Sequence, residues 1–327
     1  MLTAEQIKAV IAERIPEGLI IPQHTDKGHF YLHIKWEELY PSVTTKSGIL
    51  DSPHLKKWAA GLAVEYIKEK WDVLTAPILP GATGAVVAIE RENIFKAAVQ
   101  SHDDQFKDAG DVGTRGHKVV DLYLNKWMEG NKPTDIKTLI TESDSRIFAI
   151  ARSAEMFCND FHVIPLASEL LVASVKHRFA GTLDSLMMVL RITEVGNRAC
   201  SHDYWNVSTR NLNKLKCLKC NQKGEMEFSL VDWKSSNSID KAEYAMQVSA
   251  YWQALYEMTG LKPKRIYIVR LDKHQAKYEV RVLTNRSKAF KAFLSTSKVY
   301  DWLNDGNSKL VSASPREPIT LEELIAK

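Results

Sequence analysis

An acidic residue and a lysine stand two positions apart in the apolar run Leu230-Val231-Asp232-Trp233-Lys234. If this run is a β-strand, alternate side chains share a face, so Asp232 and Lys234 project together. A carboxylate placed in this way can hold a divalent cation, and the neighbouring ammonium can act on an attacking water. Alone, the pair is more commonly a surface ion pair, so its meaning depends on other residues.

A second carboxylate stands upstream, at the end of the run Gly181-Thr182-Leu183-Asp184. The apolar residues that follow it predict a buried strand, and a charge entering such a strand needs a partner or a metal. Glycine at position 181 would leave room for a substrate backbone. Two acids on neighbouring strands offer the oxygen ligands that Mg²⁺ and Mn²⁺ prefer, whereas the simpler interpretation of Asp184 is a strand-edge aspartate.

A histidine on a predicted helix is the third candidate. His117 is followed by Val120, Leu124 and Trp127 at spacings of three, seven and ten, so it lies on the inward, apolar side of its helix. Taken alone, an inward histidine is more often a hydrogen-bonded core residue than a ligand. The helix after the Asp-x-Lys pair carries Tyr244, Gln247 and Tyr251 on one face, and these side chains could contact a phosphate, brace a ligand or simply pack.

The elements that must position these residues follow from hydrophobic periodicity. The first part of the chain, to about residue 161, is predicted to be mostly helical, and the later part combines strands with helices. Helices are predicted at 1–16, 55–70, 90–107, 114–128, 144–160, 239–259 and 286–303, and strands at 163–175, 179–191, 227–235, 264–271 and 277–283. The chain order predicts a mixed α/β fold behind a helical N-terminal region.

Three regions follow from this pattern. Residues 1–110 form a mostly helical region packed on the core, and residues 111–310 form the core with a cysteine- and histidine-containing insert at 194–226. Residues 311–327 form a tail with a short helix, for which Thr320 and Glu323 have capping-box spacing. No phosphate-binding Gly-rich loop leads into Gly-Lys-Ser/Thr, so no motor domain is expected.

In chain order the candidate residues form four motifs: Gly-x-x-x-His ending at His117, Gly-Thr-x-Asp ending at Asp184, Asp-x-Lys ending at Lys234, and Gln-x-x-x-Tyr ending at Tyr251. This series, over 113–251, resembles the RecB-like branch of the PD-(D/E)XK nucleases, which includes repair, phage, mitochondrial and CRISPR-adaptation exonucleases. The segment Pro-Ser-Val-Thr-Thr at 41–45 is similar to one found near the N-terminus of stand-alone members. The resemblance implies a restriction-endonuclease-like core with a mixed central sheet flanked by helices.

The resemblance also implies roles. His117, Asp184 and Asp232 would bind one or two Mg²⁺ or Mn²⁺ ions, with help from a backbone carbonyl near Trp233. Lys234 would orient or activate the attacking water and stabilise charge on the phosphate. Gln247 and Tyr251 would support Lys234 or contact the DNA backbone. Glu169 would be an additional acid near the metal, with a salt bridge as the alternative interpretation.

The function implied is metal-dependent hydrolysis of DNA, as an exonuclease acting on ends or single strands in recombination, repair or replication, with a recombination or replication protein as a conceivable partner. The alternative is a catalytically inactive DNA-binding or adaptor protein on the same fold. Degenerate members of the family lack an acid or the lysine, and all of these residues are present here. The resemblance therefore favours an enzyme.

The insert contains Cys200, His202, Cys217 and Cys220, which together could bind a structural Zn²⁺. The one-residue gap between Cys200 and His202 is tighter than usual for zinc, so a reduced hairpin extension stays open as the alternative. An iron–sulfur cluster is disfavoured, because all four cysteines lie between the histidine motif and the Gln-Tyr helix. Basic and aromatic side chains in the insert would suit single-stranded DNA: Arg198, Tyr204, Trp205, Arg210, Lys214, Lys216 and Lys219.

Composition restricts the class of protein only loosely. The chain has 327 residues, 45% of them hydrophobic and 26% charged, and a net charge of +4, which permits a nucleic-acid partner without requiring one. No stretch has the length of a membrane span, and the acidic, amphipathic start is unlike a secretory signal. A cytoplasmic protein with reduced cysteines is therefore expected.

Overall fold

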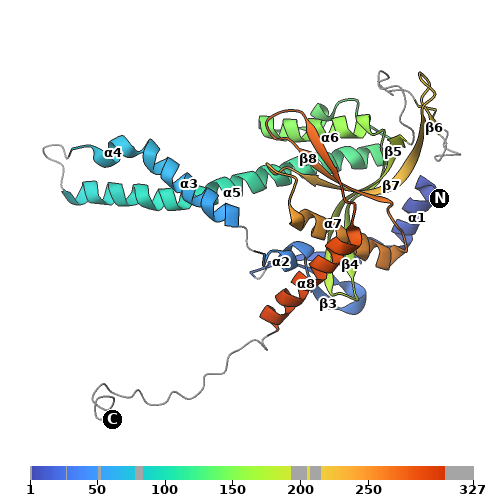
Figure 1. Ribbon diagram of the computed structural model, residues 1–327, viewed down its shortest axis with the longest axis horizontal. Coiled ribbons are helices and arrows are strands. Elements are labelled where there is room, and N and C mark those ends of the chain that lie inside the picture. The colour runs from blue at the N-terminus through green and yellow to red at the C-terminus, as the bar shows by residue number, and fades with distance from the viewer. Residues whose placement is uncertain are drawn as a thin grey trace, which may run out of the picture.

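The computed structural model describes residues 2–26, 28–50, 53–77, 84–192, 205–206 and 215–305. At its centre lies a mixed sheet in the order β4-β5-β7-β8-β9, with the short β6 paired to the start of β7 (Figure 1). Neighbouring strands run antiparallel except β7 and β8, which are parallel. The strands span Ile164–Ser174 (β4), Phe179–Ile192 (β5), Leu215–Lys216 (β6), Lys223–Lys234 (β7), Arg265–Leu271 (β8) and Tyr278–Val282 (β9).

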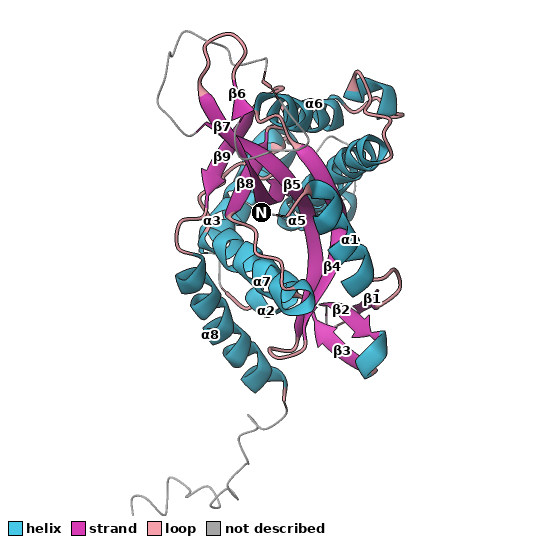
Figure 2. Cartoon of the chain, turned by 90° about the vertical axis from the view of Figure 1, so that its right-hand side faces the viewer, coloured by secondary structure: helices cyan, strands magenta, loops and turns pink. Residues whose placement is uncertain are grey.

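Helices flank this sheet on both faces, so the predicted mixed α/β architecture with a helix-flanked central sheet is confirmed (Figure 2). α7 (Ala242–Thr259) connects the parallel strands β7 and β8, and packs beside α1 (Ala4–Arg14) and α8 (Arg286–Asn304). α5 (Gly84–Met128) and α6 (Ser145–Asp160) belong to the opposite core. A crossover helix is what a parallel strand pair requires, since no tight turn can join parallel neighbours.

Alternation along β5 shows how the sheet separates two cores. Leu186 and Met188 pack with α1, α7 and α8, whereas Met187 and Val189 pack with α5 and α6. Successive side chains of a strand point to opposite faces, so a strand covered on both sides is apolar at every position. The uninterrupted apolar run after Asp184 therefore reflects a central strand.

α5 is one continuous helix, and the prediction of separate helices at 90–107 and 114–128 was wrong. The intervening glycines weaken a helix by only about 1 kcal/mol each and do not break it without a proline or a cap. The boundary predicted at residue 110 consequently falls inside a helix. The first half of α5 packs against α3 (Pro53–Glu69), which is followed by α4 (Trp71–Thr75), and together these helices project from the body as a helical arm (Figure 1).

A small antiparallel sheet lies within the region predicted to be mostly helical. It consists of β1 (Ile20–Thr25), β2 (Gly28–His33) and β3 (Glu38–Pro41), with the 3₁₀ turn η1 (Ile34–Trp36) before β3. Gly28 has φ +122°, a conformation that side chains rarely adopt, at the turn between β1 and β2. The strands are short, β1 is mostly exposed and β2 and β3 are mostly half-buried, so hydrophobic periodicity gave no signal for them.

Residues 41–45 join the small sheet to the main one. Ser42 caps α2 (Val43–Ser47) by accepting a hydrogen bond from the amide of Thr45, and it forms a bridge with Ala180 of β5. The Thr45 hydroxyl accepts from the amide of His29 and donates to the carbonyl of His29. The Pro-Ser-Val-Thr-Thr segment therefore holds β2 and α2 against β5.

The remaining elements complete the outline. The 3₁₀ helix η2 (Ile136–Leu139) precedes α6, whose N-terminus is capped by the Asp144 side chain. The tail predicted at 311–327, with Thr320 and Glu323, lies outside the described residues. Among the helices that are described, none combines the length and apolarity that a bilayer crossing demands.

Candidate metal centre

Three side chains from three elements converge near the point where the pairing of β5 with β7 ends. His117 of α5, Glu169 of β4 and Asp184 of β5 each offer one ligand atom, and these atoms lie within 4.8 Å of one another. Asp232 of β7, which the sequence analysis expected as a ligand, is not part of this trio. It lies close enough to influence the charge of both His117 and Asp184. The structure thus gathers a histidine and three acids at one place.

Glu169 occupies the trio through an unusual backbone conformation. Ser168 pairs with Ser185 and Leu170 with Leu183, which places Glu169 opposite Asp184 in the register. Its φ of +48° lies in the left-handed region, which costs about 1–3 kcal/mol for a residue with a side chain. Desolvation of its carboxylate, followed by the charges of Asp184, Asp121 and Asp232, raises the pKa of Glu169 to about 8. Glu169 therefore combines an unfavourable backbone conformation with repulsion from neighbouring carboxylates, and a bound cation would relieve the repulsion.

Asp184 is oriented by the neighbouring strand. Its Oδ2 accepts a 2.7 Å hydrogen bond from the main-chain amide of Trp233. Burial raises the pKa of Asp184, although the Lys234 ammonium and the Trp233 amide oppose that shift. The indole of Trp233 points to the other face, where its Nε1 donates to the Ser185 hydroxyl at 2.9 Å. The side chains of β7 therefore alternate as a strand requires.

Asp232 is completely buried next to a lysine. The Lys234 Nζ lies 2.8 Å from Oδ2 of Asp232 as an ion pair, but Oδ1 of Asp232 receives no hydrogen bond from any described residue. Burial, with the nearby Asp184, raises the pKa of Asp232 to about 6 despite the lysine. A buried carboxylate with unused lone pairs is costly unless a cation supplies the missing partner.

Lys234 keeps its charge in this setting. Burial disfavours the ammonium, but Asp232 and Asp184 outweigh that penalty and raise the pKa of Lys234. Its Nζ also lies 5.0 Å from the centre of the Tyr244 ring, which faces it from α7. Lys234 is thus a fixed positive charge and not a proton acceptor at neutral pH.

His117 is neutral by the same balance of forces. Burial and the positive charge of Lys234 lower its pKa to about 4, against a weaker opposite effect of Asp232. A neutral imidazole has a lone pair to offer to a metal. Asp121, one helical turn after His117, adds a further negative charge near Glu169 and accepts a hydrogen bond from Asn125. Asp121 was not among the residues predicted from the sequence, although its His-x-x-x-Asp spacing from His117 is a usable signal.

Gln247 and Tyr251 of α7 form a pair beside the acids. Gln247 Nε2 donates to the Tyr251 hydroxyl at 3.0 Å. A Cβ atom added to Gly181 would lie 2.5 Å from Cε1 of Tyr251, so this glycine makes room for the tyrosine ring. The expected role of Gly181, to admit a substrate backbone, is therefore replaced by packing against Tyr251. The expected support of Lys234 by this pair is not seen among the described residues. The side-chain hydrogen bond described for Gln247 and Tyr251 joins them to each other.

The small sheet contributes one residue that the sequence did not single out. The Tyr31 hydroxyl lies 3.1 Å from the Thr182 hydroxyl, and burial together with the charge of Glu169 raises the pKa of Tyr31. Nothing in the sequence around residue 31 indicates chemistry, because its position depends on how residues 41–45 attach β2 to β5. The small sheet therefore places a phenol at the border of the acidic cluster.

The insert is described only in part. Cys217 is buried and Cys220 half-buried on the hairpin between β6 and β7, whereas Cys200 and His202 lie outside the described residues, so the zinc site stays a prediction. Trp205 does not present an exposed ring to DNA, because it is buried against Gly224 and Leu190. Lys216 and Lys219 belong to the hairpin, and the other expected basic and aromatic residues lie outside the description: Arg198, Tyr204, Arg210 and Lys214.

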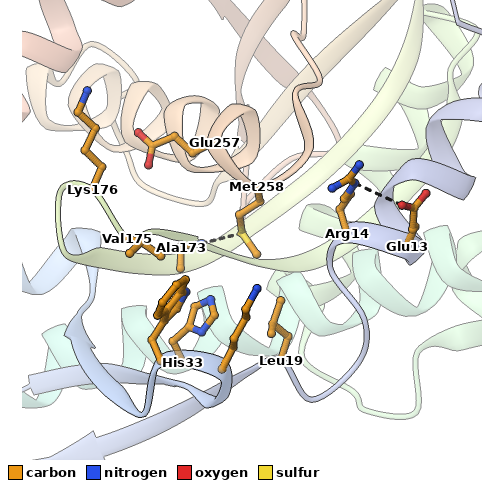
Figure 3. Close-up of a pocket in the computed structure, with 11 residues that line it drawn as sticks. Glu13, Arg14, Leu19, His33, Ala173, Val175, Lys176, Glu257 and Met258 are labelled. Atoms are coloured by element: carbon orange, nitrogen blue, oxygen red, sulfur yellow. Dashed lines mark hydrogen bonds and ion pairs between the residues drawn. The ribbon is translucent and has the colours of Figure 1, made fainter.

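A separate cavity of about 710 Å³ lies between β2, the end of β4 and the end of α7 (Figure 3). The site residues that the structure describes do not line it. Its acidic groups are already engaged, since Glu13 pairs with Arg14 and Glu257 accepts a hydrogen bond from Ser174. The trio and the Asp232–Lys234 pair remain the main concentration of chemical groups among the described residues.

Comparison with known proteins adds no family. The chain matches no protein-family model, and no curated protein is detectably similar to it in sequence.

Proposed function

We propose that this chain is a divalent-metal-dependent nuclease with a PD-(D/E)XK-type core that hydrolyses phosphodiester bonds in DNA. The observation that carries the proposal is the convergence of His117, Glu169 and Asp184 beside the buried pair of Asp232 and Lys234. Such a set of one neutral nitrogen, several carboxylates and one retained ammonium is suited to an oxygen-preferring cation and an anionic substrate.

The residues present fit a Mg²⁺ or Mn²⁺ ion. The Oδ1 atom of Asp232 receives no hydrogen bond from a described residue, and Glu169 and Asp184 repel each other in the absence of a cation. His117, Glu169, Asp184 and Asp232 would hold the ion. When bound, the cation would supply positive charge to the phosphate and activate water for attack at phosphorus.

The protein's own groups would then divide the remaining tasks. Lys234, as a permanent ammonium, would orient the water and stabilise the additional negative charge on the phosphate oxygens. The Trp233 amide would keep Asp184 in its ligand orientation. The hydroxyls of Tyr31 and Tyr251 border the site and could donate to phosphate oxygens of the bound strand. Hydrolysis from strand ends is the mode that the family resemblance favours.

One assay tests this function directly. End-labelled linear and circular DNA, each single- and double-stranded, are incubated with the protein and Mg²⁺ or Mn²⁺, with and without EDTA. We expect metal-dependent cleavage of linear substrates, and loss of at least about a thousandfold in Asp232→Ala and Lys234→Ala. The matched controls are Asp240→Ala and Lys264→Ala, an exposed acid and an exposed lysine outside the acidic cluster.

The outcomes separate the alternatives. Cleavage that survives in Asp232→Ala or Lys234→Ala contradicts the assignment of the site. DNA that is bound but never cut, under any metal, supports the inactive DNA-binding alternative instead. Cleavage of circles would identify an endonuclease.

A further inference from the structure

The arm carries an exposed apolar line along α5, away from the metal centre. Phe95, Val99 and Phe106 are 51%, 70% and 62% exposed, and His102 lies between them. Their spacings of four, three and four residues are those of the two inward positions of a coiled coil. We call these four residues the α5 seam.

The three apolar residues of this seam are left exposed, whereas His102 is half-buried. In this half of α5 the buried position is Ala98, and the half-buried positions Val87, Arg91, Ile94 and Ser101 lie on the same side of the helix. Ala97 and Asp103 are half-buried on other sides of it. At 100° per residue the seam lies about a quarter turn away from that side. Large apolar side chains kept in line on a free helix face mark a surface for another protein.

The seam is self-complementary when two α5 helices run antiparallel. With the two-fold axis between Gln100 and Ser101, Phe95 of one copy is level with Phe106 of the other, and Val99 with His102. Each contact then occurs twice, as a two-fold symmetric interface requires. Antiparallel coiled-coil packing pairs the two inward positions in this way.

Charges flanking the seam agree with the same register. Lys96 and Asp103 occupy equivalent flanking positions one heptad apart, and antiparallel pairing brings Lys96 of each copy next to Asp103 of the other. Among the described residues, Lys96 pairs with Glu92 on the helix surface, and Asp103 pairs with His102 and accepts a hydrogen bond from Gln100. Such pairs between solvent-accessible side chains are weak. A parallel alignment would instead bring Lys96 next to Arg91 of the other copy, which is a like charge.

We infer that the arm is a dimerisation element, in which the α5 seam packs antiparallel against the seam of a second copy of this chain. Two helical hairpins joined in this way form a four-helix bundle, with the two α5 helices in contact. The inference does not depend on the nuclease activity.

Sedimentation equilibrium or light scattering of the full chain over a range of concentrations tests it. We expect a wild-type dimer, and a dissociation constant about a hundredfold higher in Phe106→Glu. Trp302→Glu, at a similarly exposed aromatic residue on α8, should leave the dimer intact. Circular dichroism of each variant confirms that it is folded.

Charge reversal tests the antiparallel register. Lys96→Glu should weaken the dimer, and Lys96→Glu combined with Asp103→Lys should restore it to near the wild-type constant. The inference is overturned if the wild-type chain stays monomeric at micromolar concentrations. It is also overturned if Phe106→Glu leaves the dissociation constant of the dimer unchanged. A dimer that the double reversal does not restore overturns the antiparallel register.

Discussion

The main-chain amide of Trp233 donates its hydrogen bond to the carboxylate of Asp184, where a strand ladder would normally place a main-chain carbonyl. The register between β5 and β7 is Ser185 with Val231, so Asp184 and Asp232 face each other just past the last paired residues. The antiparallel pairing of β5 with β7 ends next to Asp184 and Asp232, and the Asp184 side chain accepts the hydrogen bond of the Trp233 amide there. The two strands are thereby held together at the point where their carboxylates repel each other.

This hydrogen bond separates two roles of Asp184. Asp184→Asn keeps an oxygen that can accept from Trp233, so we expect the free energy of unfolding to change by less than about 1 kcal/mol while metal binding and cleavage are lost. Asp184→Ala leaves the amide without that acceptor. We expect it to lower the free energy of unfolding by about a further 1–3 kcal/mol, which is the usual penalty for a buried donor left unsatisfied. Urea unfolding in EDTA measures both variants. Equal stability of Asn and Ala would show that the bond contributes nothing.

The raised pKa of Glu169 predicts a pH dependence of stability. Because its pKa is about 8 in the folded protein and near 4.5 when unfolded, its contribution is fully present below pH 4.5 and is lost as the pH rises through 8. The expected loss is about 1 kcal/mol, much less than the whole shift implies, because the residue is partly exposed and its charge is screened.

Unfolding in EDTA at pH 5 and pH 8 measures the effect. Glu169→Gln cannot ionise and should lose less stability between these two pH values than the wild type. Glu65→Gln, at an exposed acid on the arm, is the control and should follow the wild type. A wild-type slope that Glu169→Gln does not reduce would contradict the prediction.

Addition of a divalent cation should reverse this loss. Proton release from Glu169 and Asp232 frees ligands, so Mn²⁺ should stabilise the protein more at pH 8 than at pH 5. At a concentration one hundred times its dissociation constant the ion contributes about 2.7 kcal/mol. Thermal unfolding with increasing Mn²⁺ measures this, and EDTA should remove it. A stabilisation that persists in a His117→Ala, Asp184→Ala double variant would place the ion elsewhere.

The two glycines Gly181 and Gly110 should respond oppositely to alanine. In Gly181→Ala the new methyl meets the Tyr251 ring at 2.5 Å, so we expect a loss of about 1–3 kcal/mol and a displaced tyrosine hydroxyl. Gly110 lies in the middle of α5 with open space around it, and Gly110→Ala should stabilise by about 0.5–1 kcal/mol. Denaturant unfolding compares them. A neutral Gly181→Ala variant would show that Tyr251 shifts without cost.

The main strands and the order of the motifs could be predicted because they depend on local patterns. The strand predicted at 179–191 is Phe179–Ile192, and the helix predicted at 239–259 is Ala242–Thr259. The alternation of β7 also placed Asp232 and Lys234 on one side, as their ion pair requires. These features need only strand and helix periodicity, which a single sequence contains.

What the sequence could not supply is the pairing between distant segments. Glu169 joins the trio through its register opposite Asp184 and through a positive φ, neither of which has a sequence pattern. Tyr31 reaches the site because the small sheet packs against β5, where Ser42 bridges to Ala180. The continuity of α5 was missed because the glycines at 110 and 113 resemble a helix end when no competing capping residue is considered.

The single helix α5 carries a residue of the candidate metal site, His117, and an exposed aromatic residue of the arm, Phe106. His117 sits near its body end and Phe106 about 17 Å further out along the same rod, at 1.5 Å of rise per residue. Because both residues belong to one uninterrupted helix, a tilt of the arm would carry His117 with it. Gly116, one residue before His117, allows α5 to pack closely on Ile150 of α6, where an added Cβ would lie 2.8 Å from the isoleucine side chain.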